Sequence, residues 1–384
     1  MKKSFLFFIL VLLLCLNAKA LQFTPEHYTQ QAQILRNLDI EASYLSDMIF
    51  LEFKESSMDM HSKTLVDTMR EFYKITPIIR KILEKENIPQ EFLYLAIVES
   101  GLKIHSISRT KAVGVWQFMK PTAQTLGLRI DPYVDERKDL VKSTYAAITY
   151  LKQLKEQFGK WYLAILAYNC GDGKLRQAIK KAKSDDLRVL LDPDKKYLPL
   201  ETRIFIRKIL TMAFLANNND FLISQDSALL NYALSSEVKK ISVPPSVSLR
   251  ELAKVAKMSY KEFKRYNPHF NYDFTPPDKK DYYMYIPLSK SVAVEKALEN
   301  VKLAKVDTTI PHTKIYIVKE GDSLYTIARK HRISVESIKE YNKIKGNLIN
   351  INQKLVLKIK ENNNAKIKTT QKISKSSHTK VVSR

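Results

Sequence analysis

The sequence predicts a mainly α-helical protein that ends in two small βααβ modules. Apolar residues recur at helical spacing through the first half of the chain, for example at Ile75, Ile79 and Leu83. Farther on, one segment is repeated 75 positions later without a gap, which indicates two copies of one structural unit. The chain has only eight glycines, and six of them lie from Gly101 to Gly173. Because glycine allows unusual backbone conformations and close approach to a ligand, we expect the functional site in that stretch.

The chain begins with the features of a secretory signal peptide. Lys2 and Lys3 form a positive n-region, and Phe5 to Leu16 is an apolar run too short for an ordinary membrane span. Ala18-Lys19-Ala20 fits an A-x-A cleavage site. We therefore predict that residues 1–20 are removed and that the protein is exported to the periplasm or cell envelope.

Cysteine usage limits the ways in which the mature chain can be stabilised. Lipidation at Cys15 is the less favoured reading, because the bulky Leu14 precedes it; association with the membrane surface stays open. After cleavage only Cys170 remains, so no intramolecular disulfide can form and an apolar core must stabilise the fold. Cys170 lacks an evident base partner and is interpreted as inert.

The charge balance favours an anionic partner. The formal net charge is +24, and removal of the three leader lysines leaves +21. Nucleic acid, anionic lipid headgroups or an anionic cell wall would all suit such a chain. The signal peptide argues against nucleic acid, and the chain has no recognisable nucleic-acid-binding motif. Protein partners cannot be named from the sequence.

Residues 21–69 are predicted to form an N-terminal helical region ahead of a helical domain at 70–220. Its apolar residues, such as Tyr44 and Met48, are interpreted as packing surface. Met58-Asp59-Met60-His61 offers one histidine and one aspartate, which is poor evidence for ligation. No metal and no cofactor are expected.

The stretch from Ile88 to Gly101 predicts a helix whose apolar face ends in a carboxylate. Pro89 suits the first turn of such a helix and Gly101 the position just past its end. Four residues share the i, i+3, i+4, i+7 face: Phe92, Leu95, Ala96 and Glu99. Burial and the negative end of the helix dipole disfavour a charge on Glu99. We expect its pKa to be raised to about 6, the range of glycosidase acids in apolar pockets; the alternative is an ordinary surface glutamate.

The remaining helices of this domain follow from apolar spacing. A helix is predicted from Ser143 to Phe158, and another, almost wholly apolar and therefore central, from Trp161 to Tyr168. Asn169 to Gly173 ends that helix, and a further apolar helix runs to about Leu215.

Three motifs in this domain resemble those of soluble-lytic-transglycosylase domains. They are Glu99-Ser100, Gly114-Val115-Trp116-Gln117-Phe118-Met119 and Ala167-Tyr168-Asn169-x-Gly171. The Trp-Gln-Phe-Met form is most similar to the membrane-bound lytic murein transglycosylase D subgroup. The resemblance covers roughly residues 70 to 215 and implies a lysozyme-like α-helical catalytic domain.

The resemblance implies cleavage of the β-1,4 bond between N-acetylmuramic acid and N-acetylglucosamine in peptidoglycan. Glycosidic cleavage usually takes two carboxylates, and Glu99 is the one strong candidate. Glu99 would protonate the leaving oxygen and then take a proton from the muramic acid C6 hydroxyl, which closes on C1 to leave a 1,6-anhydro end. The other acids near these motifs are interpreted as solvated or capping residues: Asp131, Asp135, Asp139 and Asp172.

Around Glu99, the resemblance implies a set of supporting and substrate-binding residues. They are Ser100, Ser108, Trp116, Gln117, Tyr168 and Asn169. Tyr168 would hydrogen-bond Glu99, and Gln117 and Asn169 would contact the sugar amides. Trp116 is either a sugar platform or a core residue, and an isolated tryptophan on an apolar face is usually core.

The chain departs from the resembled pattern at several positions. Phe205 stands where a Pro-x-Glu-Thr-x-x-Tyr segment would place tyrosine. Lys103-Ile104 replaces Asn-Pro, Lys111 replaces glycine and Lys120 replaces proline. These departures keep open a catalytically inactive scaffold that binds the cell wall, although the presence of Glu99 argues against it. A muramidase that uses water and leaves reducing ends is a separate alternative.

The repeated segment lies in the C-terminal part of the chain. The matching pairs are Val243/Val318, Ser248/Ser323, Leu249/Leu324, Ala253/Ala328, Ser259/Ser334, Lys264/Lys339, Tyr266/Tyr341 and Asn267/Asn342. The second copy, residues 313–359, has the pattern strand, helix, helix, strand. Its stretch from Tyr316 to Leu324 closely resembles a LysM domain, a module that binds glycans containing N-acetylglucosamine, with Gly321, Asp322 and Ser323 as the expected glycan-binding turn.

The first copy, residues 241–288, is a degenerate LysM-like unit with Pro244-Pro245 in place of that turn. Whether it binds glycan or is structural only stays open. Residues 289–312 are interpreted as a linker, and 360–384 as a basic disordered tail.

Overall fold

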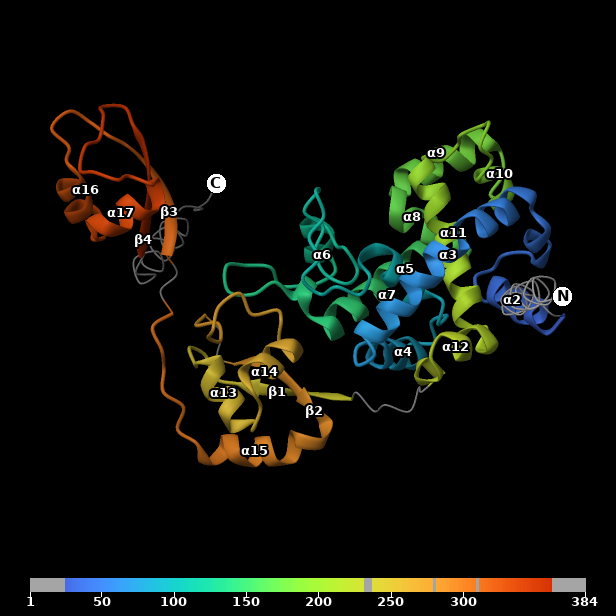
Figure 1. Ribbon diagram of the computed structural model, residues 1–384, viewed down its shortest axis with the longest axis horizontal. Coiled ribbons are helices and arrows are strands. Elements are labelled where there is room, and N and C mark those ends of the chain that lie inside the picture. Colours follow the sequence, from blue (N-terminus) through green and yellow to red (C-terminus); the bar gives the residue numbers. More distant parts are fainter. Residues whose placement is uncertain (1–24, 231–236, 279–280, 309–310, 361–384) are drawn as a thin grey trace, which may run out of the picture. The chain divides into compact units, whose positions relative to one another are not determined.

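The computed structural model describes residues 25–230, 237–278, 281–308 and 311–360. The predicted signal peptide, Cys15 and the basic tail beyond residue 360 lie outside these ranges. The described residues form two compact units: one contains those up to Thr275 and those between positions 279 and 303, and the other contains Pro276–Asp278 and those from Ala304 onward (Figure 1). No helix in the described part is both long and apolar enough to cross a membrane.

The chain enters the first unit through helices that cover one side of its core. They are α2 (Pro25–Asn37), the 3-10 turn η1 (Ala42–Ser46), α3 (Met48–Glu71) and α4 (Thr76–Lys85). Asp47 caps α3, because its carboxylate accepts the N–H of Phe50 at 2.8 Å. Helix α11 (Leu200–Ala216) packs on α3 and on α5 (Phe92–Ser100).

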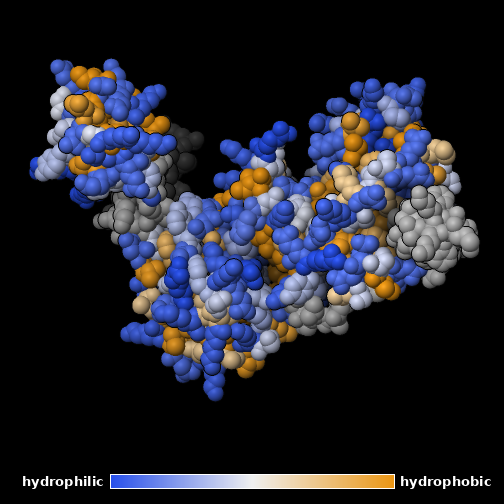
Figure 2. Space-filling model, viewed as in Figure 1, coloured by the Kyte–Doolittle hydropathy of each residue, from blue (hydrophilic) through white to orange (hydrophobic). Residues whose placement is uncertain are grey.

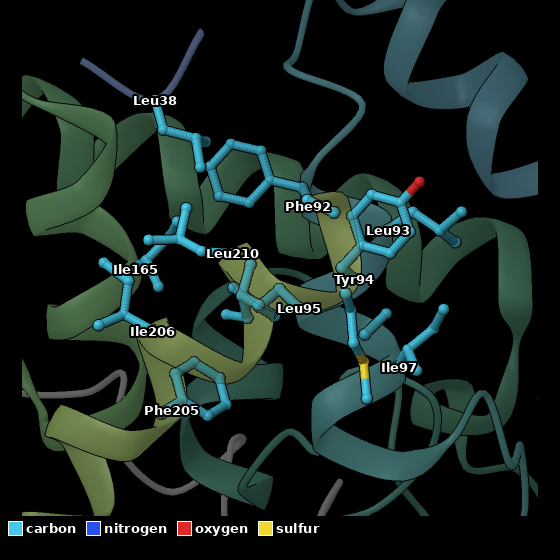
Figure 3. Packing of buried hydrophobic residues seen from close by; sticks show 14 of the residues in the cluster. Leu38, Phe92, Leu93, Tyr94, Leu95, Ile97, Ile165, Phe205, Ile206 and Leu210 are labelled. Atoms are coloured by element: carbon cyan, nitrogen blue, oxygen red, sulfur yellow. The ribbon is translucent and has the colours of Figure 1, made fainter. Parts of the chain in front are cut away.

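Helix α5 lies at the centre of this core. Its residues from Phe92 to Ile97 are all buried, and Figure 3 shows Phe92 beside Leu38 and Leu95 beside Leu210 of α11. Gly101 ends the helix with φ of 59°, a left-handed conformation that suits glycine. The helix starts later than predicted. Pro89 lies in the preceding turn, where its carbonyl accepts the N–H of Phe92 at 3.2 Å.

The remaining helices of the domain are short, except for α7. They are α6 (Lys120–Thr125), η2 (Glu136–Lys138), α7 (Leu140–Phe158), α8 (Trp161–Cys170), α9 (Asp172–Ala182), α10 (Leu187–Leu190), α12 (Asn219–Gln225) and η3 (Ser227–Leu230). Residues Tyr162 to Ala167 of α8 are all buried between α7, α9 and α11. The almost wholly apolar helix is central, as predicted.

Two βααβ modules follow. The first consists of β1 (Val238–Val243), α13 (Leu249–Val255), α14 (Tyr260–Tyr266) and β2 (Tyr282–Pro287), and the second of β3 (Pro311–Ile317), α16 (Leu324–His331), α17 (Val335–Asn342) and β4 (Lys354–Lys360). In each module the two strands pair antiparallel. The predicted mainly α-helical class with two such modules is confirmed.

The repeat is visible in equivalent hydrogen bonds. Asn267 donates from Nδ2 to the carbonyls of Phe263 and Tyr285, and its Oδ1 accepts the N–H of Tyr285. Asn342, 75 positions later, makes the same three bonds with Ile338 and Val356. Each asparagine therefore joins the second helix of its module to the last strand, which explains why both copies have asparagine there.

Part of the segment interpreted as a linker is folded. Residues 289–312 include the end of a 3-10 turn, η4 (Leu288–Lys290), and helix α15 (Ser291–Asn300), which packs on α13 and β1. Ser291 and Val294 are buried on its inner face, and Leu298 is partly buried against the same core. This i, i+3, i+7 spacing is helical, so the first unit extends to Leu303.

Candidate active site

Glu99 lies in the last turn of α5 and is half-buried. Its pKa is raised to about 8, chiefly by burial and to a smaller extent by the negative charge of Glu201. No hydrogen bond to Glu99 occurs among the described residues. The carboxyl therefore holds its proton at neutral pH, and its pKa moves in the predicted direction and beyond the expected value of about 6.

Glu201 is a second cause of the raised pKa of Glu99, after burial, and sequence reasoning missed it. It lies in the first turn of α11 and is exposed. In the sequence, Glu201 is the glutamate of the Pro-x-Glu-Thr segment that precedes Phe205. The Pro-x-Glu-Thr motif could have singled out Glu201 as a candidate site residue. No neighbouring residue indicated that it lies close to Glu99. Phe205 itself is buried in the apolar core.

Tyr168 does not make the hydrogen bond that the resemblance implied. Its hydroxyl donates to the backbone carbonyl of Trp116 at 2.6 Å. A phenol has one proton to donate, so the Tyr168 hydroxyl does not donate to Glu99 in this structure. The two groups are still close enough for the charge of Glu99 to raise the pKa of Tyr168, although burial is the larger cause. Tyr168 therefore joins α8 to the loop that carries Trp116.

The loop from Gly114 to Phe118 is fixed from several directions. Ser100 Oγ donates to the carbonyl of Val115 at 2.8 Å, which joins the end of α5 to the loop. Trp116 is completely buried, and its Nε1 donates to Thr144 Oγ1 at 3.0 Å. Of its two readings, Trp116 is thus a core residue, and the substrate-contact reading is wrong.

In the side-chain amides of Gln117 and Asn169, one polar atom already makes a hydrogen bond within the protein. Gln117, with φ of 48°, donates from Nε2 to the carbonyl of Gly114 at 2.7 Å. Asn169 accepts at Oδ1 from the Thr202 hydroxyl at 2.7 Å. No further bond is recorded for Gln117 Oε1 or Asn169 Nδ2 in the described part of the chain. These two free ends have acceptor and donor character, respectively.

Ser108 and Cys170 have local roles. Ser108 Oγ accepts the N–H of Ala112 at 2.9 Å and contacts the Thr110 hydroxyl, so it stabilises a turn. Burial raises the pKa of the Cys170 thiol, which keeps it protonated and agrees with the inert interpretation.

The four aspartates near the motifs are capping or paired residues. Asp131 accepts the N–H groups of Tyr133 and Val134, and Asp139 caps α7 by accepting the N–H of Lys142. Asp135 and Asp172 form ion pairs with nearby arginines. Asp135 and Asp139 are buried, so solvation, the other part of that interpretation, does not describe them.

In the second unit, the predicted glycan-binding turn uses its polar groups internally. Asp322 accepts from the Tyr316 hydroxyl at 2.7 Å and from the N–H of Lys319 at 2.8 Å. Ser323 forms a capping box with Thr326. Gly321 has φ of 78°. Internal hydrogen bonds therefore fix the conformation of the turn. Figure 2 shows apolar side chains on the visible face of this unit.

A large pocket lies elsewhere in the first unit. It has a volume of about 1410 Å³ and is lined by residues such as Tyr73, Arg80, Tyr145 and Val238. None of its lining residues belongs to the predicted site. Within the described ranges, no three His, Cys, Asp or Glu side chains are arranged to bind a metal ion.

Comparison with known protein families matches three parts of the chain. Residues 76–190 match the transglycosylase SLT domain, 237–303 the LysM-like domain of lytic transglycosylase MltD, and 316–358 the LysM domain. The SLT match agrees with the predicted class of the helical domain. The first-copy match reaches residue 303, which agrees with the inclusion of α15 in that unit.

Two curated relatives and one solved structure are similar over longer stretches. Membrane-bound lytic murein transglycosylase D from Escherichia coli K12 is 28% identical over 287 residues, which cover 72% of this chain and 61% of the relative. The protein of that name from E. coli O6:H1 gives the same values. The 70 kDa soluble lytic transglycosylase SLT70 from E. coli aligns with a TM-score of 0.31 and 19% identity over 40% of this chain and 24% of that chain.

The chain spans about three fifths of the length of the curated relatives that it matches. Its residues match, in order, a transglycosylase SLT domain, the LysM-like domain of lytic transglycosylase MltD and a LysM domain, and the chain is similar to membrane-bound lytic murein transglycosylase D.

Proposed function

We propose that this protein is a peptidoglycan lytic transglycosylase. It would cleave the β-1,4 bond between N-acetylmuramic acid and N-acetylglucosamine and leave 1,6-anhydromuramic acid ends. The observation that carries the proposal is the desolvated carboxyl of Glu99, at the end of a buried helix in the part of the chain that matches an SLT domain, with a pKa raised to about 8. Such a group keeps its proton at neutral pH and, once it has lost that proton, is a stronger base than an ordinary carboxylate.

In the first step, Glu99 donates its proton to the glycosidic oxygen. The bond from muramic acid C1 to that oxygen breaks, and N-acetylglucosamine leaves with a hydroxyl group. Because Glu99 is desolvated and near Glu201, its carboxylate is poorly stabilised. The free-energy cost of that buried charge favours proton uptake in the following step.

In the second step, the Glu99 carboxylate accepts the proton of the muramic acid C6 hydroxyl. The C6 oxygen bonds to C1, and Glu99 returns to its protonated form. No water is consumed, and the nucleophile belongs to the substrate, which gives it a high effective concentration. The free ends of Gln117 and Asn169 suit the N–H and C=O of a sugar acetamido group, respectively.

The LysM domain would bind the same polymer at a second place. The turn from Gly321 to Ser323 is shaped by internal hydrogen bonds, and Leu348 and Ile351 nearby in the module expose most of their surface. Apolar contacts of this kind suit the faces of sugar rings. Peptidoglycan strands are the proposed partner, the exported cell envelope the proposed location, and a contact with the membrane surface is compatible with the net charge of +24.

A muramidase that uses water is the second candidate, and Glu201 is the observation that favours it. Its charge reaches Glu99, so a second carboxylate lies near the first, as hydrolytic glycosidases require. The third alternative, an inactive scaffold, has only Phe205 and the altered loop residues in its favour.

Mass spectrometry of purified glycan strands after digestion separates the three functions. The wild type is expected to release products with anhydromuramic ends, which are lighter by one water than reducing ends. Reducing ends would identify a muramidase. An absence of products, with intact sedimentation on peptidoglycan, would identify a scaffold. Glu99→Gln serves as the inactive reference protein.

A further inference from the structure

The first LysM-like unit (β1 to α15, residues 238–303) shares a buried interface with the catalytic domain. The contact segment of the catalytic domain is Arg129–Asp139. Asp135 donates its N–H to the carbonyl of His269 at 2.9 Å, and Asn271 donates its N–H to the carbonyl of Tyr133 at 2.9 Å. Val134 is fully buried in the apolar core of the LysM-like unit. The two domains therefore share backbone pairing and a core residue.

A polar cluster at this interface buries two carboxylates. Tyr282 and Tyr283 of β2 place their hydroxyls 2.8 and 2.9 Å from Glu136 Oε1, and Tyr283 also lies 2.5 Å from Asp139 Oδ2. Lys142 Nζ completes the set at 2.7 Å from Glu136. Both carboxylates are 1% exposed. Removal of one partner would leave a buried charge short of a hydrogen bond, which is costly.

The residue after Glu136 connects this cluster to the active-site loop. Arg137 Nη1 donates to the carbonyls of Lys111 and Phe118, each at 3.2 Å. Its own carbonyl oxygen lies 2.1 Å from where a Cβ on Gly114 would be. Arg137 is therefore packed against both ends of the Gly114–Phe118 loop, which carries Gln117.

In the first LysM-like unit, the region equivalent to the predicted glycan-binding turn of the LysM domain is covered by other residues of the same unit. Val247 occupies the position of Asp322, 75 residues earlier. It donates its N–H to Thr275 Oγ1 and accepts the N–H of Thr275, both at 2.9 Å. Val247 and Thr275 are buried. In the first LysM-like unit, this turn is therefore not accessible to a glycan.

We propose that the first LysM-like unit positions the active-site loop and does not bind glycan at this face. Tyr282 and Tyr283 orient Glu136, and the adjacent Arg137 sets the backbone of the Gly114–Phe118 loop on which Gln117 depends. Tyr283 and Tyr282 are positioning residues, since neither touches substrate. This inference rests on the proposed transglycosylase function for its kinetic readout only.

The test is Tyr283→Phe, with Tyr260→Phe as the matched control. Tyr260 also bonds a carboxylate, Asp273, but within the LysM-like unit. Both variants are made with Trp161→Phe, because Trp116 and Trp161 are the only tryptophans and Trp116 then reports on the loop alone. The measurements are Trp116 emission and acrylamide quenching, kcat and KM on a soluble glycan, melting temperature, and sedimentation with insoluble peptidoglycan.

In Tyr283→Phe we expect red-shifted Trp116 emission, stronger quenching and a fall in kcat of about tenfold or more, because small misplacements near the chemistry are costly. Sedimentation should not change, and Tyr260→Phe should resemble the parent. If Tyr283→Phe had the same Trp116 emission and kcat as Tyr260→Phe, the LysM-like unit would not position the loop, and the proposal would be overturned. Lost sedimentation with normal kcat on the soluble glycan would make it a glycan-binding module and also overturn it.

Two further comparisons keep the test decisive. If Tyr283→Phe does not fold, Tyr282→Phe removes one hydroxyl and leaves the bonds of Tyr283, and the same outcomes apply to it. If the parent protein shows no cleavage, the proposed function fails, and the fluorescence of Trp116 alone then judges the positioning role.

Discussion

The Tyr168 hydroxyl lies 2.6 Å from the carbonyl oxygen of Trp116. This bond joins the end of α8 to the loop that carries Trp116, and Ser100 of α5 donates to the carbonyl of Val115 in the same loop. The loop is therefore bound to both helices that form the site. In this chain the motif tyrosine shapes the backbone around Glu99, and the carboxyl itself is left without a hydrogen bond in the described structure.

Glu99→Gln is expected to abolish cleavage and to keep the fold. Glutamine has nearly the same shape but no proton to donate. The folded-state pKa of about 8 lies above the unfolded value, so the stability that the carboxyl contributes is complete in acid and is lost as pH rises through about 8. The variant should thus melt at or above the wild-type temperature, with the larger gain in alkaline buffer. Calorimetry at two pH values and a turnover assay check this; retained turnover would remove Glu99 from its role.

Activity is expected to fall as pH rises through about 8, because Glu99 then loses the proton that it must donate. Glu201→Gln should move this alkaline limb to lower pH, since the charge of Glu201 contributes to the raised pKa. The measurement is kcat/KM on a soluble glycan across pH. An alkaline limb near the unperturbed pKa of about 4.3 would show that Glu99 is solvated.

Tyr168→Phe should lower the free energy of unfolding by about 1 kcal/mol, the usual net value of one hydrogen bond. Turnover should also fall, because the loop loses one attachment. The alkaline limb of the pH profile should stay in place, since the hydroxyl bonds Trp116 and not Glu99. A large shift of that limb would indicate a direct bond to Glu99 during turnover.

Gly114→Ala should be more destabilising than Gly127→Ala. Both glycines have positive φ, 86° and 81°, so alanine costs about 1–2 kcal/mol of backbone strain at either. At Gly114 the new Cβ would also lie 2.1 Å from the Arg137 carbonyl, whereas nothing lies within 4 Å at Gly127. Chemical denaturation compares the two, and Gly114→Ala alone should lose activity. Equal losses of stability would contradict the close contact.

Truncation after Leu303 removes the LysM domain and leaves the first unit through its last helix. We expect weaker sedimentation with insoluble peptidoglycan but nearly unchanged cleavage of short soluble glycans. The domain would raise the local concentration of substrate and take no part in the chemistry. An equal loss on both substrates would show that it contributes to catalysis.

Several features could be predicted because they depend on neighbouring residues. The helix that ends at Gly101, the central apolar helix before Asn169 and the repeat seen at Asn267 and Asn342 follow from local spacing. The helix in the segment 289–312 had the same kind of signal, in Ser291, Val294 and Leu298, but the assumption of a linker concealed it.

The amino-acid sequence by itself determined that this chain is mainly helical, that Glu99 ends an apolar helix face and that a βααβ module occurs twice, because periodicity and turn residues act over a few positions. Only the tertiary structure decided the partner of the Tyr168 hydroxyl, the burial of Trp116, the effect of Glu201 on the pKa of Glu99 and the attachment of the first module through Glu136. These contacts join residues distant in the chain, and their geometry depends on how complete helices and strands pack against one another.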